Sequence, residues 1–238
     1  MTTSESFEPN YAVLVTDLGG RRGFELRIRE LLVISTKYML LIALPVATVF
    51  FIMGRTFIGL WMGPGYSGSA TILTVLTIAM LAHFMEMPAH TVLLGLCKHR
   101  VVALFTLVQA LANLGLSICL VRRIGLMGVA LGTLIPMVIF TIASLIVYFR
   151  FFLKLSLGDY LKRSCALPIL IQAPFLLTLL LLAKYYPPQS LLSFFSEIFV
   201  ALIPYGALAL VVCISQSERR AFLRVAERFG LRLSPRFS

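Results

Sequence analysis

The chain has 238 residues, of which 59% are hydrophobic and only 13% are charged, and its mean hydropathy is +0.95. No soluble core of this size could bury so much apolar side chain, so these values exclude an ordinary soluble domain and indicate a protein surrounded largely by lipid. The formal net charge of +11 suggests nucleic-acid binding, but nearly all Lys and Arg lie between apolar runs or in the two tails. That distribution is typical of membrane topology, and we expect no nucleic-acid partner.

After a polar segment over residues 1–30, six apolar runs follow, each with roughly the 17–25 residues that cross a hydrocarbon core. The runs are Leu31–Met53, Ala70–Leu96, Val101–Val121, Leu126–Phe149, Cys165–Ala183 and Leu191–Ser215. The sequence therefore predicts an all-α integral membrane bundle of about six transmembrane helices over residues 31–215. A basic tail over 216–238 is expected to lie along the membrane as an amphipathic helix.

The basic residues predict the orientation of these helices. Sixteen lie in the two tails and in one set of connecting segments, whereas the opposite set holds only Arg55, Arg122, Arg123 and Lys184. The positive-inside rule then places both termini in the cytoplasm. The pair Arg122–Arg123 departs from this pattern, and it either binds an anionic substrate or simply ends a helix.

The segment Gly54–Ser69 mixes aromatic residues with five glycines and a proline. We expect it to form an interfacial turn on the outer face, anchored by Phe57, Trp61 and Tyr66.

Signatures of enzymes are missing from the sequence. It has no GxxxxGK[ST] phosphate loop, no GxSxG and no HExxH. The four cysteines stand singly, so we expect no disulfide, and we expect no metal and no cofactor. The chain is therefore predicted not to be an enzyme.

Glu86 is the one carboxylate that we place deep in an apolar run, and His83 and His90 share its helical face at spacings of three and four. Ionisable groups at that depth normally face a wet cavity or a partner. The cluster either binds and releases protons during transport, with Glu86 facing a central cavity, or forms a hydrogen-bonded pair that holds a kink at Pro88.

Further polar positions in the apolar runs are Lys37, Gln109, Asn113 and Gln172. Lys37 either extends its charge to the interface or offers it to a phosphate-bearing substrate. Gln109 and Asn113 lie one turn apart in the third run, where amides serve either as contacts between helices or as substrate ligands. Gly128 and Gly132 form a small-xxx-small pattern that allows close helix approach.

Several stretches from about residue 20 to 150 together resemble the C-terminal half of polysaccharide flippases of the multidrug/oligosaccharidyl-lipid/polysaccharide exporter superfamily. They are Thr36-Lys37-Tyr38, Leu44-Pro45, Phe57–Gly63 with Tyr66, Pro88, Leu93–Arg100, Asn113-Leu114, Ser117-Ile118, and Gly125–Thr133 with Pro136. After residue 150 the match is one of hydropathy only.

This resemblance implies one lobe of a two-lobed exporter, in a truncated or half-length form, with lipid-linked oligosaccharide as its substrate. The partner is then a second six-helix lobe or a second copy of the chain. The resemblance implies Lys37, Arg55, Arg122 and Arg123 as candidate ligands of a pyrophosphate, which requires cations. A cation-coupled multidrug or metabolite exporter and a non-transporting scaffold or inactive remnant are the alternatives.

Overall fold

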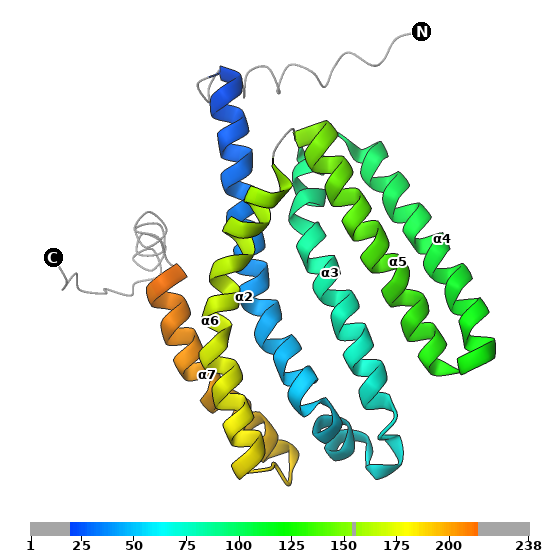
Figure 1. The fold of residues 1–238 in the computed structure, drawn as a ribbon, viewed down its shortest axis with the longest axis vertical. Helices are drawn as coiled ribbons and strands as arrows, with labels where there is room; N and C mark the ends of the chain where they lie inside the picture. The colour runs from blue at the N-terminus through cyan, green and yellow to red at the C-terminus, as the bar shows by residue number, and fades with distance from the viewer. Residues whose placement is uncertain (1–19, 154–155, 214–238) are drawn as a thin grey trace, which may run out of the picture.

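The computed structural model describes residues 20–153 and 156–213, which form six long helices joined by short turns (Figure 1). The helices are α2 (Gly20–Met62), α3 (Ser69–Gly95), α4 (His99–Ile124), α5 (Leu126–Val147), α6 (Leu157–Tyr185) and α7 (Leu191–Cys213), with a 3₁₀ turn η1 (Pro64–Tyr66) and a π-helical segment η2 (Tyr148–Leu153). All six are long and apolar enough to cross a membrane, which confirms the predicted all-α architecture of a multi-pass membrane protein.

The predicted turn at Gly54–Ser69 is wrong over its first nine residues, because α2 continues as a helix to Met62. Phe57 stacks on Phe194 of α7, with ring centroids 5.4 Å apart, so packing between helices holds this stretch in place. The helix ends only at Gly63, whose φ of 95° suits glycine. The helical residues 20–30 likewise continue into the first span, while residues 1–19 and the predicted amphipathic tail lie outside the described residues.

Five helices lie side by side in the order α6, α2, α3, α5, α4, and α7 packs against both α6 and α2 (Figure 1). Each neighbouring pair in this order is in contact, and α4 packs mainly on α5. Successive long helices run in opposite directions, and there are six of them. The start of α2 and the end of α7 therefore point toward the same end of the bundle (Figure 1). The location of the two chain termini relative to a membrane stays a prediction.

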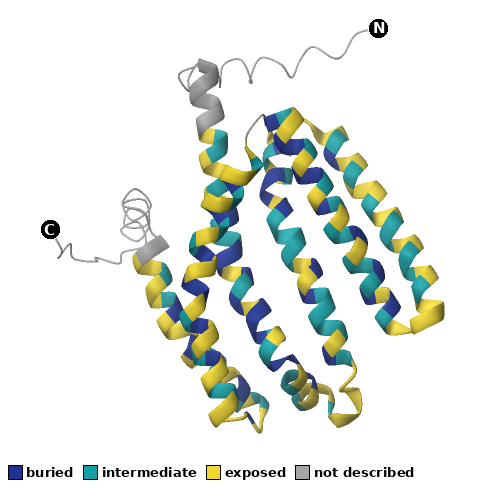
Figure 2. Ribbon diagram, viewed as in Figure 1, coloured by how far each residue is buried: buried dark blue, intermediate teal, exposed yellow. Residues whose placement is uncertain are grey.

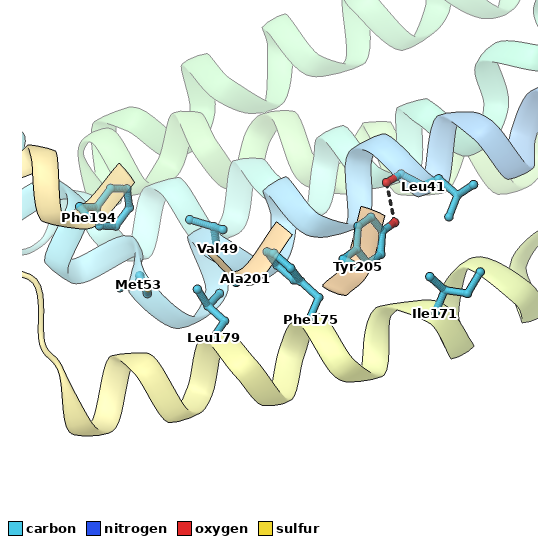
Figure 3. Close-up of a cluster of buried hydrophobic side chains, with 9 residues drawn as sticks. All are labelled: Leu41, Val49, Met53, Ile171, Phe175, Leu179, Phe194, Ala201 and Tyr205. Atoms are coloured by element: carbon cyan, nitrogen blue, oxygen red, sulfur yellow. Dashed lines mark hydrogen bonds between the residues drawn. The ribbon is translucent and has the colours of Figure 1, made fainter. Parts of the chain in front are cut away.

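One apolar core joins α2, α6 and α7, and we call it the α2–α6–α7 core (Figure 3). Its buried residues are Leu41, Val49, Met53, Ile171, Phe175, Leu179, Phe194, Ala201 and Tyr205. The Tyr205 hydroxyl donates a hydrogen bond of 2.6 Å to the backbone carbonyl of Leu41. Pro45, four residues further on, has no N–H for that carbonyl, so Tyr205 supplies the donor that the proline removes.

A second buried cluster, at the end of the layer where α3 ends and α6 begins, gathers side chains from α2 to α6, including Leu32, Leu93, Val102, Phe149 and Tyr160. Burial is concentrated on the central helices, whereas α4 is mostly exposed (Figure 2). Val102 is its one buried residue. Such an apolar and exposed surface is expected where lipid or another membrane helix covers the protein.

Candidate functional site

Glu86 lies on α3 and is almost completely buried against α5, with 1% of its surface exposed. Its Oε2 accepts a hydrogen bond of 2.9 Å from the Thr141 hydroxyl, and its Oε1 accepts another from Ser144. His90 lies one turn further along α3, with Nε2 2.8 Å from Glu86 Oε1. The expectation that Glu86 faces a central cavity is therefore wrong, because its two oxygens are engaged between α3 and α5.

Tyr148, at the start of η2, adds a fifth member to this group. Its hydroxyl lies 3.2 Å from His90 Nε2, and its ring packs edge-on against Phe105 of α4 at a centroid distance of 5.4 Å. We call Glu86, His90, Thr141, Ser144 and Tyr148 the Glu86 network.

Helical spacing explains how the Glu86 network forms. Residues 86 and 90 share one face of α3, and residues 141, 144 and 148 share one face of the helix that packs against it. A carboxylate with two hydroxyl donors and an imidazole is satisfied without water, which is how a charge persists in a membrane helix. Of the two interpretations of Glu86, the hydrogen-bonded pair therefore agrees with the geometry better than the proton-binding carboxylate in a cavity.

His83 is not part of the Glu86 network. It is half-buried, its ring lies 6.5 Å from that of its neighbour Phe84, and no hydrogen bond joins it to another described residue. Among the described residues there is also no group of three or more His, Cys, Asp or Glu side chains that could hold a metal.

The structure does not gather the candidate cations around Glu86. Lys37 is half-buried on α2, with Nζ 5.6 Å from the centre of the Tyr38 ring. Arg55 is exposed on α2, and Arg122 and Arg123 are exposed in the last turn of α4. Cations at a helix C-terminus interact favourably with the helix dipole, which suits the interpretation that this pair ends a helix.

Asn113 joins α4 to α5. Its Oδ1 accepts hydrogen bonds from Ser117 at 3.1 Å and from Thr133 of α5 at 3.4 Å. A Cβ built on Gly132 would lie 2.4 Å from the Ser117 hydroxyl oxygen, and one built on Gly128 would lie as close to the backbone of α4. The small-xxx-small pattern is therefore the contact surface between these two helices.

The sequence analysis missed the partners of Glu86 on α5, and it also missed Glu197. Glu197 is the seventh residue of α7, inside a candidate span, and its Oε2 is buried without a hydrogen bond from any described residue. Its position seven residues into an apolar run was the available signal. Glu86 is therefore not the one acidic residue inside a candidate span, since Glu197 is a second.

In comparisons with known proteins, no protein-family model, no curated protein and no solved structure matches the chain. The resemblance to polysaccharide flippases accordingly stays a prediction from the sequence. What the structure contributes is the placement of the ionisable residues within the six helices.

Proposed function

We propose that the chain is a component of a membrane flippase that moves polyprenyl-pyrophosphate-linked oligosaccharide across the bacterial inner membrane for polysaccharide biosynthesis. The observation that carries the proposal is the contact of His90 with Glu86, a carboxylate buried between two candidate membrane spans. Ionisable groups are expensive in a membrane interior, and where they occur they usually serve transport, proton transfer or ligand binding.

The resemblance to the flippases supplies the substrate class. A pyrophosphate needs cations, and Lys37 offers one within the first span while Arg55 offers one near the opposite end of the same helix. In this proposal the glycan passes between the six-helix layer and a second unit, either another six-helix lobe or a second copy of the chain. The lipid tail remains in the bilayer.

Glu197 favours a second candidate, a cation-coupled exporter of drugs or metabolites. A carboxylate within a span whose Oε2 lacks a described donor suits a cationic substrate or a coupling cation. This candidate predicts that Glu197→Gln abolishes resistance to cationic drugs, and that Lys37→Gln leaves it unchanged.

The test uses a bacterium that lacks its own polysaccharide flippase. The chain is expressed alone and with a matching N-terminal lobe, and surface polysaccharide is measured by antibody binding. Restored display that is lost in Lys37→Gln, and retained in the matched control Lys162→Gln on the exposed surface of α6, would support the proposal. Membrane insertion of every variant is verified by fractionation, so that loss of protein is not mistaken for loss of transport.

Absence of display in both arrangements, with the chain present in the membrane, would refute the flippase proposal. Cationic-drug export under the same conditions would then identify the exporter. Inactivity in both assays would indicate a scaffold or an inactive remnant. Reporter fusions after Met62 and Ser238 test the orientation separately, since the proposal requires Ser238 to be cytoplasmic.

A further inference from the structure

The π-helical segment η2 carries two consecutive buried aromatic residues that contact different helices. Tyr148 and Phe149 have 0% and 1% of their surfaces exposed. Successive residues of a helix project in different directions, so the two large neighbouring rings can contact different helices. η2 is such a place, because it lies between α3 and α4 on one side and α6 on the other.

The Tyr148 side leads to Glu86. The Tyr148 hydroxyl lies 3.2 Å from His90 Nε2, and the same nitrogen lies 2.8 Å from the Glu86 carboxylate. The two rings, His90 and Tyr148, are 5.5 Å apart between centroids. A change at Glu86 therefore reaches η2 through a single imidazole.

The Phe149 side leads to the contact between α2 and α6. The Phe149 ring lies 4.6 Å from the Tyr160 ring of α6, and the Tyr160 hydroxyl is 2.5 Å from the Thr36 hydroxyl of α2. Tyr160 and Thr36 are both buried. Ser164, one turn after Tyr160, is completely buried, and its hydroxyl has no hydrogen-bond partner among the described residues.

A π-helical turn can convert to an α-helical turn by a local change of hydrogen bonding. It accommodates one extra residue per turn with poorer packing, and π turns occur often at functional sites. Conversion of η2 to an α-helix would turn the residues that follow by about 100° relative to α5. Coupling between distant sites can be carried by an element that has two discrete arrangements, and conversion between a π turn and an α turn would give η2 two such arrangements.

The geometry points to η2 as a coupling element between the Glu86 network and the α2–α6 contact. When Glu86 loses its contacts with His90 and α5, Tyr148 is released, η2 rearranges, and Phe149 withdraws from Tyr160. The contact between Tyr160 and Thr36 then opens. This inference concerns motion within the chain and is tested without a substrate, so its failure would leave the proposed function intact.

The experiment measures the opening of the α2–α6 contact with a thiol reporter. Ser164→Cys is made in full-length chain whose four native cysteines are replaced by alanine, because sulfur replaces oxygen there with little change in shape. Membranes are treated with methyl methanethiolsulfonate, and the unreacted fraction is counted by gel shift with a maleimide-polyethylene glycol after denaturation. Glu86→Gln is expected to raise the reaction rate by at least about fivefold.

Two controls separate coupling from general loosening. The reporter Leu179→Cys, buried on α6 within the α2–α6–α7 core, is expected to react at the same rate with and without Glu86→Gln. Tyr148→Phe removes the hydroxyl that contacts His90, and in that background Glu86→Gln is expected to add little. If Glu86→Gln fails to fold, Ser144→Ala removes one donor to the same carboxylate and gives the same test. An equal rise at both reporters, or none at Ser164→Cys, would overturn the inference.

Discussion

The α3–α5 contact and the α2–α6–α7 core use different physical means to hold helices together. Between α3 and α5 a buried carboxylate is bonded to hydroxyls and an imidazole, so each group depends on the others. In the α2–α6–α7 core the contacts are mostly apolar, with one tyrosine hydroxyl bonded to a backbone carbonyl. A polar contact in a membrane is stable only while every group is satisfied, whereas an apolar contact tolerates small changes. The first contact is therefore the better place for a switch, and the second the better place for a fixed support.

Glu86→Ala tests this difference most strongly. It removes the acceptor of the buried Thr141 hydroxyl and the carboxylate beside His90, while Ser144 keeps the Thr141 carbonyl as an acceptor. Loss of one partner from a buried ionic pair costs about 3–5 kcal/mol. We expect the midpoint of unfolding by sodium dodecyl sulfate in mixed micelles to fall accordingly. Met87→Ala, at the next position on α3 but 40% exposed, serves as the control and is expected to change the midpoint little. Equal effects of the two substitutions would contradict the importance of the Glu86 network.

Gly132→Ala tests the close approach of α4 and α5 and has the next largest expected effect. The added methyl group would lie 2.4 Å from the Ser117 hydroxyl oxygen and 2.6 Å from the Ser117 backbone, so the two helices must separate. Such overpacking costs about 1–3 kcal/mol, measured by thermal unfolding in detergent.

Gly115→Ala is the matched control for Gly132→Ala. Gly115 lies in the middle of α4, and a Cβ there meets nothing within 4 Å. The unfolding temperature of the Gly115→Ala variant is expected to stay the same or to rise slightly, since alanine favours the helix. A comparable loss at both glycines would show that the contact at Gly132 is not the cause.

The sequence predicted the six spans well because length and hydropathy are local properties. The ends of the helices were predicted less well. The glycines of 54–69 favour a turn, and only the packing partners of residues 54–62 show that this part is helical. Phe57 contacts Phe194, which lies 137 residues later in the chain, and no local sequence pattern predicts that contact.

The candidate site shows the same division between local and distant information. The spacing of Glu86 and His90 predicted that they share a face, and the structure joins them. Thr141 and Ser144 could not be assigned to Glu86, because hydroxyl residues are common in membrane helices and only the pairing of α3 with α5 selects these two. His83 has an equally suggestive spacing and is left out, because the direction of a side chain depends on which neighbour its helix meets.

Tyr205→Phe tests the hydrogen bond from Tyr205 to Leu41 in the α2–α6–α7 core. It leaves the Leu41 carbonyl buried without a donor and is expected to cost about 1–3 kcal/mol in the same detergent unfolding assay. The cost depends on Pro45, which removes the N–H that would otherwise reach that carbonyl. In a Pro45→Ala background the same substitution is therefore expected to cost less. Identical costs in both backgrounds would mean that Tyr205 does not compensate for the proline.

Gln172→Met is expected to have the smallest effect of all. The amide Nε2 donates to the Thr48 hydroxyl at 2.7 Å, but Oε1 is buried with no donor among the described residues, so the side chain is only half satisfied. A hydrogen bond between membrane helices contributes about 0.6 kcal/mol on average, and removal of an unsatisfied polar atom offsets that loss. Methionine has a similar length and fills irregular space, so the unfolding midpoint should move by no more than about 0.5 kcal/mol. A large loss would show that Oε1 has a partner in the membrane, such as a bound water, and that the α2–α6 contact is as polar in character as the contact between α3 and α5.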